Sequence, residues 1–496
     1  MKRLACLMML VCAISACGSR TPASAPTPQS HLAAQIDSAL ADPAFENAAW
    51  GIVIQSIDDG ELLYRRNAYK LFMPASNMKL VTAAVTLAEL GADHRVPTTL
   101  EMCGTMDAGV LNGDLLVVGG GDPSISARFN DESPTAVFED WADALRERGI
   151  ERITGRVVAD DDRFEDVHIG PGWSWDYLDA SYAAEIGALL LNDGALGLRF
   201  LPGDSVGDSA SVTLDPPTSY VTFDGVVRTV EDTTDVDLSY SRDPFSNVVR
   251  LTGDISIQED TLRRTVAVHD PTMYFATVLT ETLRENGIEI AGDPVDRDDE
   301  PLLQCDSAVT VLQHLSPPVS EMIVPFLKVS QNQMGEMFMR YLGAAATDTG
   351  SVETGRRVVE SQLTSWGISP RGYVYFDGSG LSRYNYLSPD TIVRLLRVMA
   401  QREDFDVFYD ALPIAGEDGT LRNRFAGTRA ERNARAKTGF ISNARALSGY
   451  VTTRDGERLA FSLITNDFDV PVRVVEYAQD LVVELLANYS EAIEDR

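Results

Sequence analysis

The residues with the clearest capacity for chemistry are Ser76 and Lys79, which stand immediately before a long apolar segment. Residues 80–90 carry apolar side chains at helical spacing, with neither Gly nor Pro until Gly91, and this pattern predicts a buried helix. A separation of three residues places the hydroxyl and the amine one turn apart on the same helix face. A serine hydroxyl is too weakly acidic to attack a carbonyl unaided, whereas a neighbouring amine can take its proton. We therefore expect Ser76 to be a nucleophile that becomes acylated, with Lys79 as its base.

Lysine is rare in this chain, since only five of the 42 Lys and Arg residues are lysines. Arginine keeps its proton near neutral pH, but lysine can lose its proton when it is desolvated or lies beside another cation. Of the two residue types, only lysine can therefore serve as a base next to a serine. On its own, however, the Ser-x-x-Lys spacing is also what a helix-capping serine and a chance lysine produce.

The triplet Ser330-Gln331-Asn332 is the only Ser-x-Asn in the chain. Ser330 can relay a proton to a leaving amine. Asn332 can hold a substrate amide and fix Lys79 by hydrogen bonding. A surface turn is the alternative interpretation of this triplet when it is taken alone.

The triplet Lys437-Thr438-Gly439 also occurs once and follows the other two motifs in order. We expect Lys437 to supply positive charge for a substrate carboxylate and to lower the pKa of Lys79. Thr438 offers a hydroxyl to that carboxylate, and Gly439 leaves a strand edge open for a peptide. The backbone N–H groups of Ser76 and Phe440 would form an oxyanion hole. Three motifs in this order favour a single catalytic site over separate surface turns.

Together these motifs resemble those of the class C low-molecular-mass penicillin-binding proteins, the D-alanyl-D-alanine carboxypeptidase/endopeptidase family. More than 200 residues separate Lys79 from Ser330, an interval that β-lactamases keep short. The resemblance covers nearly the whole chain after its first residues. Further similar segments are Pro74-Ala75-Ser76, Gly120-Gly121-Asp122-Pro123, Asp377-Gly378-Ser379-Gly380-Leu381-Ser382-Arg383 and Ala446-Leu447-Ser448-Gly449-Tyr450.

The resemblance implies an α/β fold of the penicillin-binding and serine β-lactamase-like transpeptidase type, with an antiparallel sheet and helices on both of its sides. It also implies a mostly β insert that carries no catalysis, no cofactor, peptidoglycan stem peptides as substrates and β-lactams as inhibitors. Two positions depart from the family pattern. Gln331 stands where Asp is frequent, at a position expected to face outward. Phe440 stands where Thr or Ser is usual, so a hydroxyl for the terminal carboxylate is missing.

The elements that would position these motifs lie at both ends of the chain. An Asp-Gly turn predicts a hairpin of residues 50–57 and 61–64, and strands are expected at residues 446–451 and 459–464. Between them, residues 98–303 are rich in short strand-like runs and turns, and Asp160-Asp161-Asp162 is interpreted as a solvated turn. The expected helices are 31–40, 135–148, 272–286, 318–342, a helix ending at 366, and 470–488.

These patterns divide the chain into four parts. Residues 1–16 form a signal peptide with a basic start and a short apolar core, and residues 17–30 form a linker. We interpret Cys17 as a lipidated cysteine that anchors an exported protein in the cell envelope or periplasm. An ordinary signal peptide that contains a cysteine is the alternative. The catalytic domain comprises residues 31–97 and 304–496, and the insert comprises residues 98–303.

The remaining cysteines, the histidines and the charge narrow the function further. Cys103 and Cys305 either form a disulfide in an oxidising compartment or are two buried free thiols, and the sequence leaves both open. The five histidines are scattered singly, so a metal site is not expected. A formal net charge of −32 argues against a nucleic-acid partner.

The sequence thus predicts a lipid-anchored serine peptidase that hydrolyses the bond between two D-alanines through an acyl-enzyme. It does not distinguish a carboxypeptidase from an endopeptidase. Two alternatives are a β-lactamase or esterase with the same motifs, which the long insert disfavours, and a non-catalytic wall-binding protein, which the three intact motifs disfavour.

Overall fold

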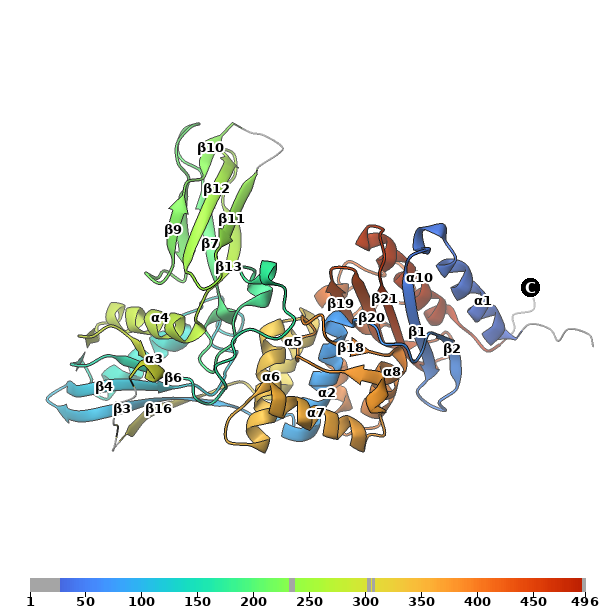
Figure 1. The fold of residues 1–496 in the computed structure, drawn as a ribbon, viewed down its shortest axis with the longest axis horizontal. Coiled ribbons are helices and arrows are strands. Elements are labelled where there is room, and N and C mark those ends of the chain that lie inside the picture. Colours follow the sequence, from blue (N-terminus) through green and yellow to red (C-terminus); the bar gives the residue numbers. More distant parts are fainter. Residues whose placement is uncertain (1–26, 232–236, 301–304, 306–307, 493–496) are drawn as a thin grey trace, which may run out of the picture.

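A computed structural model describes residues 27–231, 237–300, 305 and 308–492 of the chain. The predicted signal peptide, Cys17 and the predicted linker as far as residue 26 lie outside the described residues. The protein has the expected α/β fold, with an antiparallel sheet and its helices at one end and the sheet of the intervening segment at the other (Figure 1). Among the described residues, no helix is long and apolar enough to cross a membrane.

The sheet beside the catalytic motifs has five strands in the order β19-β20-β21-β1-β2, and every neighbouring pair is antiparallel. Both ends of the chain contribute to it, as expected, because the predicted hairpin pairs with the last strand of the chain. The strands are β1 (Ala49–Ser56), β2 (Leu62–Arg66), β19 (Arg435–Ile441), β20 (Ala444–Thr452) and β21 (Arg458–Asn466).

Helices cover both faces of this sheet. One apolar core joins the sheet to α1 (Pro28–Leu40) and α10 (Val472–Asn488), and a second joins it to the central helix α2 (Met78–Leu90). Nearly all of α2 is buried, which explains its apolar composition on every side. The other helices around α2 are α5 (Val319–Lys328), α6 (Asn332–Ala346), α7 (Val352–Ser365), α8 (Pro389–Met399) and α9 (Phe405–Asp410). A short pair, β17 (Tyr373–Val374) and β18 (Tyr386–Leu387), completes this region.

A seven-stranded sheet forms the body of the intervening segment, and α3 (Ala136–Glu147) and α4 (Pro271–Glu285) share its apolar core. Its last strand pairs with its first, so this sheet takes in residues beyond 303. The domain boundary at that residue remains a prediction. The strands are β3 (Pro97–Asp107), β4 (Val110–Val118), β5 (Arg152–Ile153), β6 (Val157–Asp160), β14 (Glu289–Ile290), β15 (Val295–Asp296) and β16 (Val309–Leu315).

A narrow β structure projects from this body, as Figure 1 shows. It is built from a three-stranded sheet, β13-β7-β8, and a four-stranded sheet in which β12 pairs with β9, β10 and β11. The strands are β7 (Ala195–Leu201), β8 (Ser211–Asp215), β9 (Thr222–Gly225), β10 (Arg228–Val230), β11 (Leu238–Arg242), β12 (Val248–Ser256) and β13 (Leu262–Ala267).

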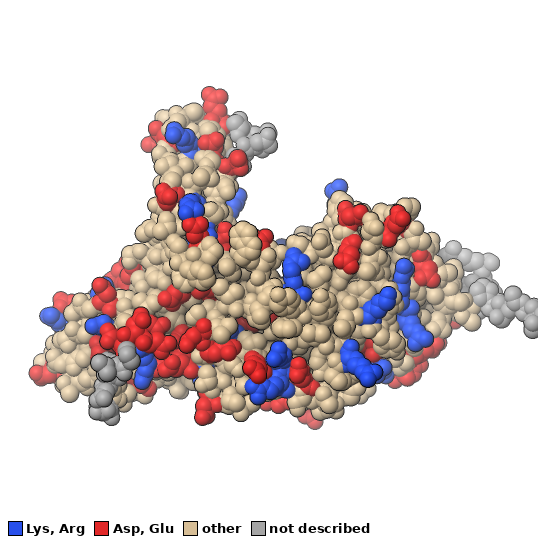
Figure 2. All heavy atoms as spheres, viewed as in Figure 1, with Lys and Arg blue, Asp and Glu red and all other residues tan. Residues whose placement is uncertain are grey.

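Acidic side chains are prominent on the face of the molecule shown in Figure 2, most densely over the region of β6 and α4. The acidic triplet Asp160-Asp161-Asp162 differs from the solvated turn that we expected. Asp160 and Asp161 are buried rather than solvated, because Asp160 pairs with Arg297 at 2.7 Å and Asp161 accepts a hydrogen bond from Thr272. The triplet that we interpreted as a solvated turn is therefore largely part of the packed insert.

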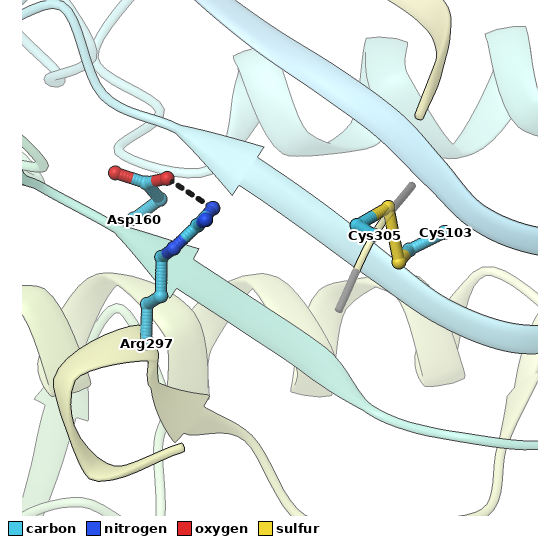
Figure 3. The surroundings of a disulfide bond; sticks show 4 residues. All are labelled: Cys103, Asp160, Arg297 and Cys305. Atoms are coloured by element: carbon cyan, nitrogen blue, oxygen red, sulfur yellow. Dashed lines mark hydrogen bonds and ion pairs between the residues drawn. A yellow bond between two sulfur atoms is a disulfide. The ribbon is translucent and has the colours of Figure 1, made fainter. Parts of the chain in front are cut away.

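A disulfide joins Cys103 on β3 to Cys305, with a Cα–Cα distance of 5.4 Å (Figure 3). Residues 103 and 305 are 202 positions apart in the sequence. The bond therefore ties the beginning of the intervening segment to its end, close to where β3 and β16 pair. Asp160 and Arg297 form their ion pair nearby.

Candidate active site

Ser76 lies in a 3₁₀ turn, η2 (Ala75–Asn77), that leads directly into α2. Its hydroxyl oxygen is 2.9 Å from the Nζ atom of Lys79 in the first turn of the helix. Neither cap position, Pro74 or Asn77, makes a side-chain capping bond. The serine hydroxyl therefore faces the lysine and does not serve as a helix cap, which was the alternative interpretation of this motif.

Lys79 is fully buried, and its Nζ atom has three hydrogen-bond partners. Besides Ser76, these are the Oδ1 atom of Asn332 at 2.6 Å and the backbone carbonyl of Ser379 at 2.5 Å. The amide oxygen and the carbonyl can only accept. A neutral amine has two N–H groups for these two acceptors and one lone pair, which is left to accept the proton of the Ser76 hydroxyl. The geometry thus suits an uncharged Lys79 that acts as a base.

Burial lowers the pKa of Lys79 to about 7, while the charges of Asp377 and Glu336 act in the opposite direction. We had expected the charge of Lys437 to lower this pKa. Desolvation is instead the principal cause. Lys437 is itself fully buried, and its pKa falls well below the usual value because of burial and then because of the charge of Lys79.

Asn332 begins α6, and its orientation is fixed by the intervening segment. Its Nδ2 atom donates to the backbone carbonyl of Tyr182 at 2.7 Å, which leaves Oδ1 facing Lys79. Ser330 precedes it with a positive φ of 64° and lines the same pocket as Ser76. Gln331 does not face outward as expected. It is buried, and its side chain caps α6 by accepting from the backbone N–H of Met334 at 2.8 Å.

Glu336 is a buried carboxylate of the site that the sequence reasoning missed. It lies one turn after Asn332 on α6, and its Oε1 atom accepts from the backbone N–H of Ser379 at 2.9 Å. The carbonyl of the same Ser379 accepts from Lys79. Burial, reinforced by the charge of Asp377, raises the pKa of Glu336 to about 7. The four-residue spacing from Asn332 was the sequence signal that could have identified it.

Asp377 shapes the loop that carries Ser379. Its carboxylate accepts from the backbone N–H groups of Gly380 and Ser382, at 2.8 and 2.6 Å, and from the indole N–H of Trp173 at 2.9 Å. Gly380 has a φ of +84°, and a Cβ atom there would lie 2.0 Å from the carbonyl oxygen of Ala75. The loop therefore packs directly against the turn that bears the serine.

The third motif lies on β19, an edge strand of the five-stranded sheet. Lys437 donates to the carbonyl of Thr438 at 2.9 Å, and the Thr438 hydroxyl donates to that of Thr420 at 2.8 Å. A Cβ atom at Gly439 would lie 2.5 Å from the carbonyl oxygen of Pro74, so glycine allows the serine turn to approach the strand. Phe440 is 54% exposed beside the pocket.

A cavity of about 540 Å³ brings the three motifs together. Two tyrosines from the intervening segment, Tyr177 and Tyr182, form part of its wall, with their rings 5.6 Å apart. The insert, which was expected to carry no catalysis, thus contributes side chains to the wall of the pocket. The lining residues are Ser76, Tyr177, Tyr182, Ser330, Asn332, Gly380, Leu381, Thr420, Thr438, Phe440, Ile441, Ser442 and Arg445. Across the described ranges, no group of three or more His, Cys, Asp or Glu side chains is arranged to hold a metal ion.

Known proteins are similar to this chain in sequence and in fold. Residues 32–489 match the D-Ala-D-Ala carboxypeptidase 3 (S13) family. A D-alanyl-D-alanine carboxypeptidase from Actinomadura sp. (strain R39) is 33% identical over 478 residues, which cover 92% of this chain and 85% of that protein. The crystal structure of penicillin binding protein 4 (dacB) from Haemophilus influenzae superposes with a TM-score of 0.80 at 23% identity, covering 92% of this chain and 99% of that one. A second structure of that protein, in complex with a β-lactam, has a TM-score of 0.72 at 22% identity and covers 91% of this chain and 99% of that one.

Proposed function

Because the chain belongs to the D-Ala-D-Ala carboxypeptidase 3 (S13) family, we propose that Ser76 is the nucleophile of a serine D-Ala-D-Ala carboxypeptidase that acts on peptidoglycan stem peptides. The observation that carries this proposal is the buried amine of Lys79. It is held by two acceptors, Asn332 and Ser379, with its third hydrogen-bonding position directed at the serine hydroxyl.

In the proposed acylation step, Lys79 takes the proton of the Ser76 hydroxyl while the serine oxygen attacks the carbonyl between the two D-alanines. The backbone N–H groups of Ser76 and Phe440 stabilise the resulting oxyanion. Ser330 gives its hydroxyl proton to the leaving amine and receives in exchange the proton that Lys79 took from Ser76, so Lys79 is neutral again as the peptide bond breaks and D-alanine departs. Water then attacks the acyl-enzyme with Lys79 again as base, which releases the shortened peptide and restores the serine.

Substrate binding is proposed to involve β19 and the motif at its centre. Thr438 presents its hydroxyl to the pocket, and Thr420 lies within hydrogen-bonding distance of it. Lys437 lies beneath them and adds positive charge when it is protonated. Gly439 and the edge position of β19 leave room for an extended peptide to align with the strand. Cleavage of internal D-amino-acid cross-links by the same site forms part of this proposal.

The proposed location is the cell envelope, with the protein exported and held by a lipid on Cys17. The support is the basic and apolar start of the chain, the small residues before the cysteine and the Ser/Pro/Ala-rich linker after it. Metabolic labelling with a clickable fatty acid tests this location. A Cys17→Ser variant should lose the label and leave the membrane fraction. Equal labelling of both proteins would contradict the anchor.

Labelling with a fluorescent penicillin, followed by peptide mapping, tests the proposed mechanism. We expect a single adduct on Ser76, which is lost in Ser76→Ala, together with release of D-alanine from a pentapeptide by the unmodified enzyme. An adduct on another residue, or no adduct, would contradict the mechanism. Turnover of a chromogenic cephalosporin faster than of the peptide would instead favour a β-lactamase.

A further inference from the structure

Arg445 lines the pocket beside the end of the Lys437-Thr438-Gly439 motif. It is directly opposite Phe440 in the register of β19 and β20, so the two side chains share one face of the sheet. The guanidinium carbon is 5.1 Å from the centre of the Phe440 ring, a distance at which cation and ring attract each other. Arg445 lines the cavity although its side chain is only 13% exposed.

The guanidinium of Arg445 retains unused hydrogen-bonding capacity. Its Nη2 atom donates to the carboxylate of Glu476 on α10, while its Nε atom is buried without a partner among the described residues. A buried N–H group without an acceptor is unfavourable, so an acceptor brought into the cavity beside Arg445 would be favoured. The neighbouring Arg424 pairs with Asp480 at 2.5 Å and also has one buried guanidinium nitrogen without a partner among the described residues, but it does not line the cavity.

The charges around the cavity indicate what kind of ligand would bind there. In the part of the chain that the structure describes, neither Lys79 nor Lys437 forms an ion pair with a protein carboxylate, whereas Arg445 pairs with Glu476. Burial lowers the pKa of Lys437 well below its usual value, whereas burial lowers that of Arg445 only to about 10. Arg445 is the cationic side chain among the residues that line the cavity, and with a pKa of about 10 it keeps its charge at neutral pH, so a carboxylate is the complementary group.

We propose that Arg445 is a specificity-determining residue that binds the α-carboxylate of the leaving residue of the substrate. It takes the place of the hydroxyl that the chain lacks at Phe440, and the phenyl ring holds the guanidinium at the cavity wall. This inference rests on the proposed function. It accounts for how a chain with Phe at position 440 can still recognise a peptide that ends in a free carboxylate.

The test compares two peptides that differ only in their last group, one ending in D-Ala-D-Ala and the other in D-alaninamide. Arg445→Gln should lower kcat/KM for the free acid by about 10- to 100-fold, the range for losing a hydrogen bond to a charged group. It should change kcat/KM for the amide less than about threefold. Arg424→Gln is the matched control, because it removes the adjacent guanidinium outside the cavity, and it should leave the acid-to-amide ratio unchanged.

Three results decide between the inference and the function on which it rests. Thermal melting and complete labelling of Ser76 at saturating penicillin verify that Arg445→Gln is folded. The role of Arg445 is refuted, while the peptidase activity stands, if the folded variant keeps the normal ratio of kcat/KM for the acid to kcat/KM for the amide. An equal fall of this ratio in Arg424→Gln would refute it as well. If the unmodified enzyme neither releases D-alanine nor forms the Ser76 adduct, the proposed function and this inference both fail.

Discussion

The proposed catalytic pair of Ser76 and Lys79 depends on the removal of one lysine from water. Lys79 is fully buried, and the loss of hydration lowers its pKa to about 7 against the opposing charges of Asp377 and Glu336. Burial also lowers the pKa of Lys437 well below its usual value, and the charge of Lys79 acts in the same direction. A lysine with this pKa is a base near neutral pH, whereas an exposed lysine would be protonated almost completely.

The pH dependence of acylation should follow the protonation of Lys79. Below a pH of about 7 the amine is charged and cannot accept the serine proton, so the second-order rate constant for a β-lactam should fall about tenfold per pH unit. Above a pH of about 8 the amine is neutral and the rate constant should level off. Stopped-flow measurements from pH 5 to 9 test this expectation. A rate constant that does not change over this range would show that Lys79 is not the base.

Replacing Lys79 with arginine separates its charge from its basicity. Arg retains the positive charge and hydrogen-bond donors but cannot give up a proton, so Lys79→Arg should slow acylation by about 10²- to 10⁴-fold. Lys70→Arg, at an exposed lysine outside the site, is the matched control and should react at the normal rate. Rapid labelling of Lys79→Arg by penicillin would mean that another group activates the serine.

The sequence could predict some residues of the candidate site but not others. Ser76, Asn332 and Thr438 were predicted as site residues because each belongs to a motif with a chemical reason for its spacing, and in the structure all three line one cavity. Tyr182 could not be predicted, since its contribution is a backbone carbonyl 150 residues before its partner. Thr420 likewise acts through a contact across the fold that no local pattern encodes.

At the scale of elements, α6 supplies more than the Ser-x-Asn motif. Asn332 and Glu336 lie one turn apart on this helix, and both reach the surroundings of Lys79, one directly and one through Ser379. The positions of the amine and of the loop are thus set by the same helix. Arg340, one further turn along, lies 4.0 Å from the Glu336 carboxylate and partly balances its charge.

Glu336→Gln should shift the acid limb of the pH profile. The charged carboxylate favours the protonated form of Lys79, so its removal should lower the lysine pKa and move the midpoint of acylation to lower pH. Gln retains an oxygen that can accept from the Ser379 N–H, so the loop should keep its position. Glu353→Gln on α7, where the side chain is 67% exposed, is the control and should leave the midpoint unchanged. A midpoint that moves to higher pH would contradict this account.

Most elements of the catalytic half followed from periodicity. The hairpin, α1 and α10 were expected within about three residues of their observed ends, because an Asp-Gly turn and apolar residues at helical spacing are strong local signals. The helix α8 was missed, although Ser388 caps it and Pro389 occupies its first turn. That start signal was present in the sequence.

At the scale of the whole molecule, the intervening segment is structurally joined to the active site. Tyr182 orients Asn332, and Trp173 donates to the carboxylate of Asp377. The sequence indicated a separate mostly β insert because its strands are short and its turns are rich in Gly, Asp and Pro. The sequence could not indicate the contacts of Tyr182 and Trp173 with the active site, because loops far apart in the chain meet only once both regions have folded. The insert therefore belongs to the architecture of the pocket.

Removing the disulfide should affect the stability of the insert more than the chemistry of the site. Cys103 and Cys305 close a long loop between β3 and the segment before β16, so the bond restricts the unfolded chain strongly. The double variant Cys103→Ser/Cys305→Ser should lose about 2–5 kcal/mol in the unfolding of this region, measured by denaturant titration. Penicillin acylation at 25 °C should stay within about threefold of the unmodified rate, since β3 and β16 still pair and the loop around Tyr182 is held by its own hydrogen bonds. A large fall in acylation by a folded variant would instead show that the disulfide-linked end of the insert controls the position of Asn332.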